Sequence, residues 1–157
     1  MVYLRFCDRI CTAVVLSVVV LSGAGVEGHS GFMAFPGELV AFLASTDLDV
    51  SSMFYVDTLG LSEVERTPFT LVVDGGGTEL RITLVQSRVD TGYTVLGWRT
   101  TDLSSTVDQL RGKGIEFLRY QGMDQDEHAV WTAPDGTRVA WFRDPHGNVL
   151  SIHQPPS

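Results

Sequence analysis

The 157-residue sequence predicts an α+β fold built from two tandem β-α-β-β-β modules. The first observation is an internal repeat: the tetrapeptide STDL at residues 45–48 returns as TTDL at residues 100–103, and each copy begins an amphipathic stretch of helical periodicity. The second observation is that both stretches end at a glycine, Gly60 and Gly114, so the two helices agree in length within one residue. We therefore expect two copies of one supersecondary unit, with the functional site at the surface between them.

The first module is predicted from strand and turn signals around the first copy of the repeat. Asp47 is a favourable N-cap and Gly60 a favourable C-terminal stop. Residues 74–77 read Asp-Gly-Gly-Gly, which is typical of a tight turn between two strands. The predicted strands are 39–44, 61–66, 69–73 and 79–86, with the helix between the first two.

The second module repeats this order. Its helix carries Leu103, Val107 and Leu110 on one face. The turn 144–148 contains a proline at a φ-restricted position and a glycine that can adopt positive φ. The predicted strands are 95–99, 115–120, 138–143 and 148–153, with 130–133 as an additional short strand after the polar loop 122–129.

Composition restricts the class of partner. The chain carries 11 Lys and Arg residues against 19 Asp and Glu residues, a net charge of −8, and it contains no run of basic residues. Nucleic acid is therefore not an expected partner. Both cysteines, Cys7 and Cys11, precede the repeat, so the body of the protein has no disulfide or thiolate ligand and must be stabilised by packing.

The first 33 residues differ from the rest and allow two interpretations. Arginines precede the apolar run 10–21, and the small residues 22–24 after it are typical of a signal-peptide cleavage site. Because a membrane span takes about 20 residues, residues 10–24 are interpreted as a cleaved signal or a weak anchor, so the protein is exported or membrane-anchored. Alternatively, the basic residues are almost all Arg, as in GC-rich coding DNA where start sites are often assigned too early. Translation from Met33 would then give a cytoplasmic protein without a membrane segment.

Two motifs on the repeated frame are specific. The first is FYVDTLGL at residues 54–61, and the second is AWFRDPHGNVL at residues 140–150. In this order they resemble the vicinal oxygen chelate superfamily of glyoxalases, bleomycin-resistance proteins and extradiol dioxygenases, over residues 38–154. The resemblance implies modules at about 38–87 and 92–154 that form a curved mixed sheet around a cleft, with the helices on the convex side. It also implies a homodimer.

The resemblance further implies a divalent metal held by up to four side chains, two from each module. The matching positions here are Val40, Thr83, Val95 and Ser151. A valine side chain donates no electron pair, and neutral hydroxyls are poor substitutes for imidazole and carboxylate ligands. The sequence therefore predicts no protein-held metal and no other cofactor. A register shifted by two residues would instead offer Glu38 and His153, which are too few for a tight site.

Strand alternation divides the remaining residues between two faces. If the four metal positions face the cleft, their neighbours face the helices, and these neighbours are almost all apolar. The predicted core-facing residues are Ala41, Leu43, Leu80, Ile82, Leu84, Leu96, Trp98, Leu150 and Ile152. The predicted ligand-binding cleft consists of Val40, Phe42, Arg81, Thr83, Val95, Gly97, Arg99, Ser151 and His153.

Polar residues of this cleft have both functional and structural interpretations. Arg81 and Arg99 could bind a carboxylate or phosphate of a ligand, or each could pair with a local acid such as Glu79. His153 is the candidate catalytic base, and a solvated or hydrogen-bonded histidine is the alternative. Ser151 and His153 share a strand face at about 6.6 Å by strand rise, too far apart for a nucleophile-base hydrogen bond.

Three functions are consistent with these residues. The first is a metal-free member of the superfamily that binds a small organic ligand in the cleft, with Trp131 and Trp141 either stacking on the ligand or packing in the fold. The second is a metal-dependent lyase, isomerase or dioxygenase of the same superfamily, so enzymatic activity is left open. The third is a structural or interaction module without a small ligand.

Overall fold

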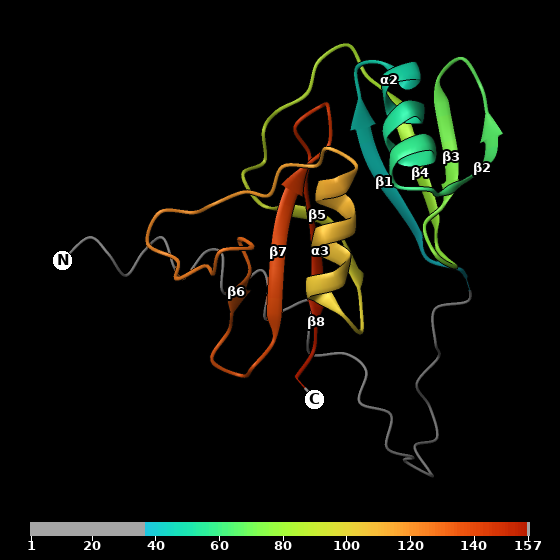
Figure 1. Cartoon of the computed structure of the whole chain (residues 1–157). Helices are drawn as coiled ribbons and strands as arrows, with labels where there is room; N and C mark the ends of the chain where they lie inside the picture. The colour runs from blue at the N-terminus through green and yellow to red at the C-terminus, as the bar shows by residue number, and fades with distance from the viewer. Residues whose placement is uncertain (1–36, 157) are drawn as a thin grey trace, which may run out of the picture. The chain divides into compact units, whose positions relative to one another are not determined.

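Each half of the chain forms one four-stranded mixed sheet (Figure 1). The structure is a computed structural model that describes residues 37–156. The first sheet has the order β1-β4-β3-β2, with β1 Val40–Ser45, β2 Ser62–Arg66, β3 Thr70–Asp74 and β4 Glu79–Leu84. The second has the order β5-β8-β7-β6, with β5 Thr94–Arg99, β6 Trp131–Thr132, β7 Arg138–Arg143 and β8 Val149–Gln154. β1 pairs in parallel with β4, and β5 pairs in parallel with β8. All other neighbouring strands are antiparallel. The predicted α+β fold of two β-α-β-β-β modules is confirmed.

One helical segment packs against each sheet. In the first module α2 (Leu48–Ser52) continues into the π-helical turn η1 (Met53–Thr58), and in the second module α3 (Leu103–Gly112) contacts β7 and β8. The aspartates of the repeat are the N-caps: Asp47 accepts backbone N–H bonds from Asp49 and Val50, and Asp102 accepts one from Ser105. The sequence did not predict the π-helical turn, because apolar spacing at three and four residues does not distinguish it from an α-helix.

The predicted strand 115–120 is absent. The edge of the second sheet is instead the two-residue strand β6, within the segment expected to form an additional short strand. Residues 115–120 touch β7 only locally, through a bond from Leu118 N to Trp141 O at 2.7 Å. The side-chain amide of Gln125 accepts the N–H of Tyr120 (2.7 Å) and donates to Leu118 O (3.0 Å). A side chain thus satisfies two of the backbone groups that a strand would have paired.

The hydrophobic core is continuous between the two modules. It joins Leu43, Tyr55, Leu71 and Ile82 of the first module with Leu103, Val107, Phe142 and Leu150 of the second. The residues predicted to face the helices are buried or pack against this core, with one exception. Leu84, the last residue of β4, is 39% exposed.

The described residues begin just before β1. Within 37–156, no helix is long and apolar enough to cross a membrane. The interpretations of residues 10–24 as a signal or anchor, and of Met33 as a start site, lie outside the described residues.

Candidate functional site

Reciprocal contacts join the modules near their strand ends. The side-chain amide of Asn148, after β7, donates to the carbonyl of Ala44 in β1 (3.0 Å). In the opposite direction, the indole N–H of Trp98 in β5 donates to the carbonyl of Gly75 after β3 (3.1 Å). Each module therefore uses the turn before its last strand to contact the other, and the Asp-Pro-His-Gly-Asn motif lies in one of these turns.

Asp144 is the centre of that turn. Its buried carboxylate accepts the hydroxyl of Tyr55 (2.7 Å), the side-chain amide of Asn148 (2.7 Å), and the backbone N–H groups of His146 (3.0 Å) and Asn148 (2.8 Å). Burial, together with the charge and hydrogen bond of Asp144, raises the pKa of Tyr55 far above its usual range, so the phenol is protonated. Since every contact of this carboxylate is with the fold itself, its role in the motif is structural.

His146 and Ser45 form a histidine-serine pair that is not a nucleophile site. The Nε2 of His146 lies 3.2 Å from Ser45 Oγ, and its Nδ1 lies 3.1 Å from Thr46 Oγ1. Ser45 is fully buried, and its hydroxyl donates its one hydrogen to the carbonyl of Asp47 (2.8 Å). The same hydroxyl also accepts from the backbone N–H of Asp47 and from Ser51 Oγ, so a buried serine that caps its own helix is not available to a substrate.

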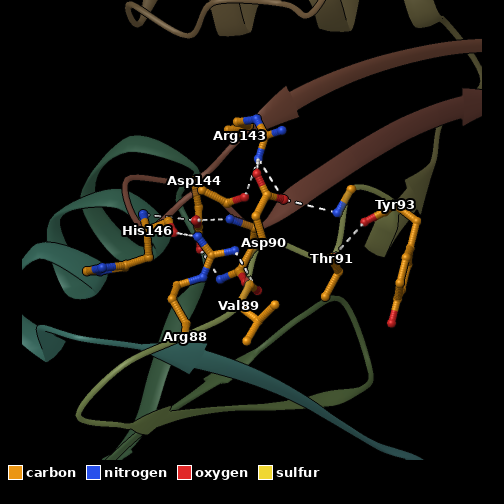
Figure 2. Close-up of polar contacts among 11 residues, drawn as sticks. Arg88, Val89, Asp90, Thr91, Tyr93, Arg143, Asp144 and His146 are labelled. Carbon is orange, nitrogen blue, oxygen red and sulfur yellow. Dashed lines mark hydrogen bonds and ion pairs between the residues drawn. The ribbon is translucent and has the colours of Figure 1, made fainter.

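The connection between β4 and β5 crosses the same turn (Figure 2). Arg88 donates to the carbonyl of His146, and Asp90 pairs with Arg143 at 3.2 Å. The backbone N–H of Gly92 and then Arg143 lower the pKa of Asp90. These contacts attach the connection between β4 and β5 to the second module. Like the contacts of Asp144, they have a structural role.

The predicted cleft residues of the second module form two rows across its sheet. We call this side, which faces away from the core, the cleft face. In the first row Arg99, His153, Val139 and Trp131 are successive partners on β5, β8, β7 and β6. In the second row Gly97, Ser151 and Trp141 are successive partners. Val95 lies at an irregularity of β5, between Thr94 and Leu96, and it packs against the core, so its assignment to the cleft is corrected.

The polar groups of the cleft face have no partners in the fold. The side chains of Arg99, Ser151 and His153 make no hydrogen bond or ion pair within residues 37–156. A Cβ atom on Gly97 would lie 2.5 Å from Ser151 Oγ, so the glycine leaves the space that this hydroxyl occupies. Burial, and then the charge of Arg99, lower the pKa of His153, which is therefore neutral at pH 7.

Three aromatic side chains border these polar groups. Trp141 is 1% exposed, which makes it a packing residue, whereas Trp131 is only partly buried. Their ring centroids are 6.2 Å apart, and Tyr120 meets Trp141 edge-on at 5.5 Å. Trp98 packs against the core, as its strand position predicts. Trp131 is thus the tryptophan whose ring a ligand could reach.

The four predicted cleft residues of the first module lie in different surroundings. Phe42 is 67% exposed, and Arg81 pairs with Glu79 at 2.8 Å, so the structural interpretation of Arg81 holds. The alignment of Thr83 with Ser151 needs correction. Arg81 pairs with Phe42, and Ser151 pairs with Gly97, the residue that corresponds to Phe42 in the repeat. Arg81 is therefore the structural equivalent of Ser151, and Thr83 that of His153.

These positions do not fit the divalent metal that the resemblance implies. Val40 and Val95 offer no donor atom, Ser151 offers a neutral hydroxyl, and the corrected fourth position is the cation Arg81. Nowhere in the described part of the chain do three His, Cys, Asp or Glu side chains gather in a way that could hold a metal. The prediction of a metal-free protein stays a prediction, and no chemistry below depends on a metal.

A separate open groove lies on the helix side. It has a volume of about 440 Å³. Its lining comes from η1, from the segment after α3 and from the end of β7: Phe54, Thr58, Lys113, Gly114, Ile115, Glu116, Leu118, Arg143, Asp144 and Pro145. None of the predicted cleft residues lines this groove.

Comparison with known proteins identifies the class to which this fold belongs. The sequence profile of the Glyoxalase/Bleomycin resistance protein/Dioxygenase superfamily matches residues 38–152. The chain therefore belongs to this superfamily, which is the group that its two motifs resemble. No curated protein matches the sequence at a significant level.

Solved structures support the fold. A putative glyoxalase family protein from Bacillus anthracis has 18% identity and a TM-score of 0.62, and the match covers 80% of this chain and 99% of that one. A superfamily member from Sphaerobacter thermophilus has 24% identity and a TM-score of 0.60, covering 78% and 98%. A lactoylglutathione lyase from Agrobacterium tumefaciens has 20% identity and a TM-score of 0.58, covering 77% and 95%. At these identities the similarity shows the fold alone.

Proposed function

We propose that the protein binds a small organic ligand in the cleft between its two modules, against the cleft face of the second module, without a metal at the superfamily's ligand positions. One observation carries this proposal. Arg99, Ser151 and His153 share one sheet face, and their side chains have no partner within residues 37–156. Polar groups beside a partly exposed indole are typical of a small-molecule site.

Binding without turnover is the function that these residues support. Ser151 and His153 lie two residues apart on one strand, so the histidine is not positioned to activate the hydroxyl. A lyase, isomerase or dioxygenase activity, such as the one named for the Agrobacterium structure, would need a metal that the four positions do not fit. One equivalent of Ni, Zn, Mn or Fe in the purified protein would overturn this proposal in favour of an enzyme.

A ligand screen with site mapping tests the proposal. We expect metabolites and antibiotics that raise the Tm to perturb the NMR signals of Gly97, Ser151 and Trp131. Perturbation of Phe54 and Leu118 instead would assign binding to the helix-side groove. If the whole screen finds no binder, the protein is a structural or interaction module and the proposal fails.

A matched pair of variants makes the mapping specific. His153→Trp should block the cleft face of the second module and abolish the Tm shift. Thr83→Trp places the same side chain at the equivalent position of the first module, and it should leave most of the shift intact. Equal effects of the two variants would contradict the placement of the ligand on the second module.

We also propose a homodimer as the working state. Large apolar side chains are exposed on the strands and turns of the first module, at 67% for Phe42, 65% for Val64 and 72% for Phe69. Burial of such residues drives association. Light scattering should give twice the chain mass, and a monomer at micromolar concentration would contradict the proposal.

The proposed location depends on residues 1–33. A cleaved signal or an anchor at 10–24 places the protein outside the cytoplasm or at a membrane, and a start at Met33 places it in the cytoplasm. Mass spectrometry of the mature N-terminus distinguishes the two.

A further inference from the structure

We infer that the ligand carries a carboxylate bound by Arg99 with Ser151 and His153, and a flat ring system that lies against Trp131. This inference rests on the proposed function and specifies the chemical class of the ligand. It follows from the charge and hydrogen-bonding state of the cleft face, from its dimensions and from the asymmetry between the two modules.

Arg99 differs from every other cation in the described part of the chain. Nine Lys and Arg residues lie within 37–156, and eight of them have a hydrogen bond or ion pair. Those eight are Arg66, Arg81, Arg88, Arg111, Lys113, Arg119, Arg138 and Arg143. In a chain of net charge −8, Arg99 is therefore the one Lys or Arg of residues 37–156 whose side chain has no partner among those residues.

The neighbours of Arg99 complete a binding site for one negative charge. His153 is its direct strand partner and is neutral at pH 7, so the local charge is that of Arg99 alone. His153 can donate one N–H, and the hydroxyl of Ser151 on the same face can donate one O–H. A carboxylate accepts two bonds from the planar guanidinium and further bonds from such neutral donors.

The row that begins at Arg99 ends at an aromatic ring. Val139 and Trp131 follow His153 across the sheet, so Arg99 and Trp131 are three strand spacings apart, roughly 14 Å between their backbones. Side chains that lean over the face shorten this span. Val139 between them is only 2% exposed, so a carboxylate joined to one or two flat rings would lie over the side chains of this row, with the ring against Trp131.

Comparison with the first module supports the assignment of the ligand's carboxylate to the second module. Its equivalent of Ser151 is Arg81, whose charge is already balanced by Glu79 at 2.8 Å. Its equivalent of Gly97 is Phe42, a large side chain that is 67% exposed where the second module has none. The negative net charge of the chain opposes anion binding only weakly, because charges beyond about 8 to 10 Å are screened at physiological salt.

Matched acid and amide probes test the inference. We would titrate the protein with 2-naphthoate and with 2-naphthamide, which differ in charge and hardly in shape, and follow the signals of the cleft face by NMR. The acid should bind at least tenfold more tightly than the amide. Arg99→Gln should weaken 2-naphthoate by about tenfold or more and leave 2-naphthamide unchanged, since bonds to charged groups contribute most of the difference.

A second arginine provides the control. Arg66→Gln removes a charge of the same kind from β2 of the first module, outside the predicted cleft, and it should change neither affinity appreciably. Arg99 is exposed, so Arg99→Gln should retain the wild-type Tm, which separates a binding effect from misfolding.

The outcomes distinguish this inference from the function on which it rests. Equal binding of acid and amide at the cleft face, or an acid affinity that Arg99→Gln does not reduce, would overturn the carboxylate assignment and leave ligand binding intact. If neither probe nor any other compound of the screen perturbs the cleft face, the carboxylate assignment and the proposed function both fail.

Discussion

Asp144 shows how one residue can connect two modules. A buried carboxylate is costly unless donors satisfy it, and here four donors do so. Three of these bonds come from its own turn, and the fourth comes from Tyr55 in the other module. The hydroxyl of Tyr55 is therefore the single group through which this carboxylate stabilises the contact between modules.

Removing that hydroxyl should destabilise the protein. Tyr55→Phe leaves a buried carboxylate short of one donor, and we expect a loss of about 2 kcal/mol in the free energy of unfolding. Urea denaturation measures the change. Tyr93→Phe, at an exposed tyrosine, is the control and should change stability little. A Tyr55→Phe variant as stable as wild type would refute the connecting role.

The same tyrosine predicts an alkaline sensitivity. The pKa of Tyr55 is raised in the folded protein, so its contribution to stability is complete below the unfolded value of about 10 and falls as the pH rises above it. Wild-type stability should therefore decline above pH 10 more steeply than that of Tyr55→Phe. Unfolding curves of the two proteins at several alkaline pH values test this, and parallel declines would contradict it.

Gly97 has a specific packing role. Gly97→Ala places a Cβ atom 2.5 Å from Ser151 Oγ, and we expect a loss of about 2 kcal/mol from the forced shift. Ser151→Ala removes the atom that is struck, so the double variant should recover about 1 kcal/mol of that loss. A thermodynamic cycle of the four proteins measures this coupling, and additive effects would show that the hydroxyl is not what the glycine accommodates.

At the scale of elements, the two helices begin in the same way. The hydroxyl of Ser45 donates to Asp47 O and that of Thr100 donates to Asp102 O, while each aspartate caps the first turn with its carboxylate. The repeat in the sequence is thus preserved in hydrogen bonds. This is why the starts of both helices could be predicted: a cap depends on residues adjacent in the chain.

The two caps should contribute similarly. Asp47→Ala and Asp102→Ala are each expected to lower the free energy of unfolding by about 1 kcal/mol. Thr101→Ala, at an exposed neighbour whose side chain makes no hydrogen bond within residues 37–156, is the control. If either aspartate variant matches the control in thermal or urea unfolding, that residue does not act as a cap.

Strands are harder to predict from the sequence than helix caps, because a strand depends on partners that are distant in the chain. The continuous apolar run 139–142 predicts 138–143, which is β7, because the residues on both faces of this strand are buried. Residues 115–120 also carry a strand signal, yet Gln125 bonds the N–H of Tyr120 and the carbonyl of Leu118, and no ladder forms. Strand propensity is local, whereas strand formation requires a free partner edge.

The candidate site, like the strands, is only partly predictable from the sequence. The alternation of side chains along a strand predicts that Ser151 and His153 share a face. The spacing of the helix repeat does not predict which residue of β4 corresponds to Ser151 in β8. The second module has a longer segment between its helix and its last two strands, so the fourth strands are displaced relative to the first strands. Only the strand pairing shows that Arg81, rather than Thr83, corresponds to Ser151.

At the scale of the whole molecule, the residues at the superfamily's metal positions predict that removal of metal ions leaves the stability of the protein unchanged. The protein should contain far less than one equivalent of transition metal per chain, and EDTA should leave its Tm unchanged, because Val40, Val95 and Arg81 bind no cation. Elemental analysis and thermal unfolding check this. A lower Tm in EDTA that Zn²⁺ or Ni²⁺ restores would contradict it.

The exchange of contacts between the turns makes each module depend on the other. Without the second module, the carbonyl of Ala44 would lose the amide of Asn148, and without the first, the indole of Trp98 would lose the carbonyl of Gly75. Part of the shared core would also be open to water. Each module is therefore incomplete without the other, although the two differ at equivalent strand positions, with Phe42 and Arg81 in one and Gly97 and Ser151 in the other.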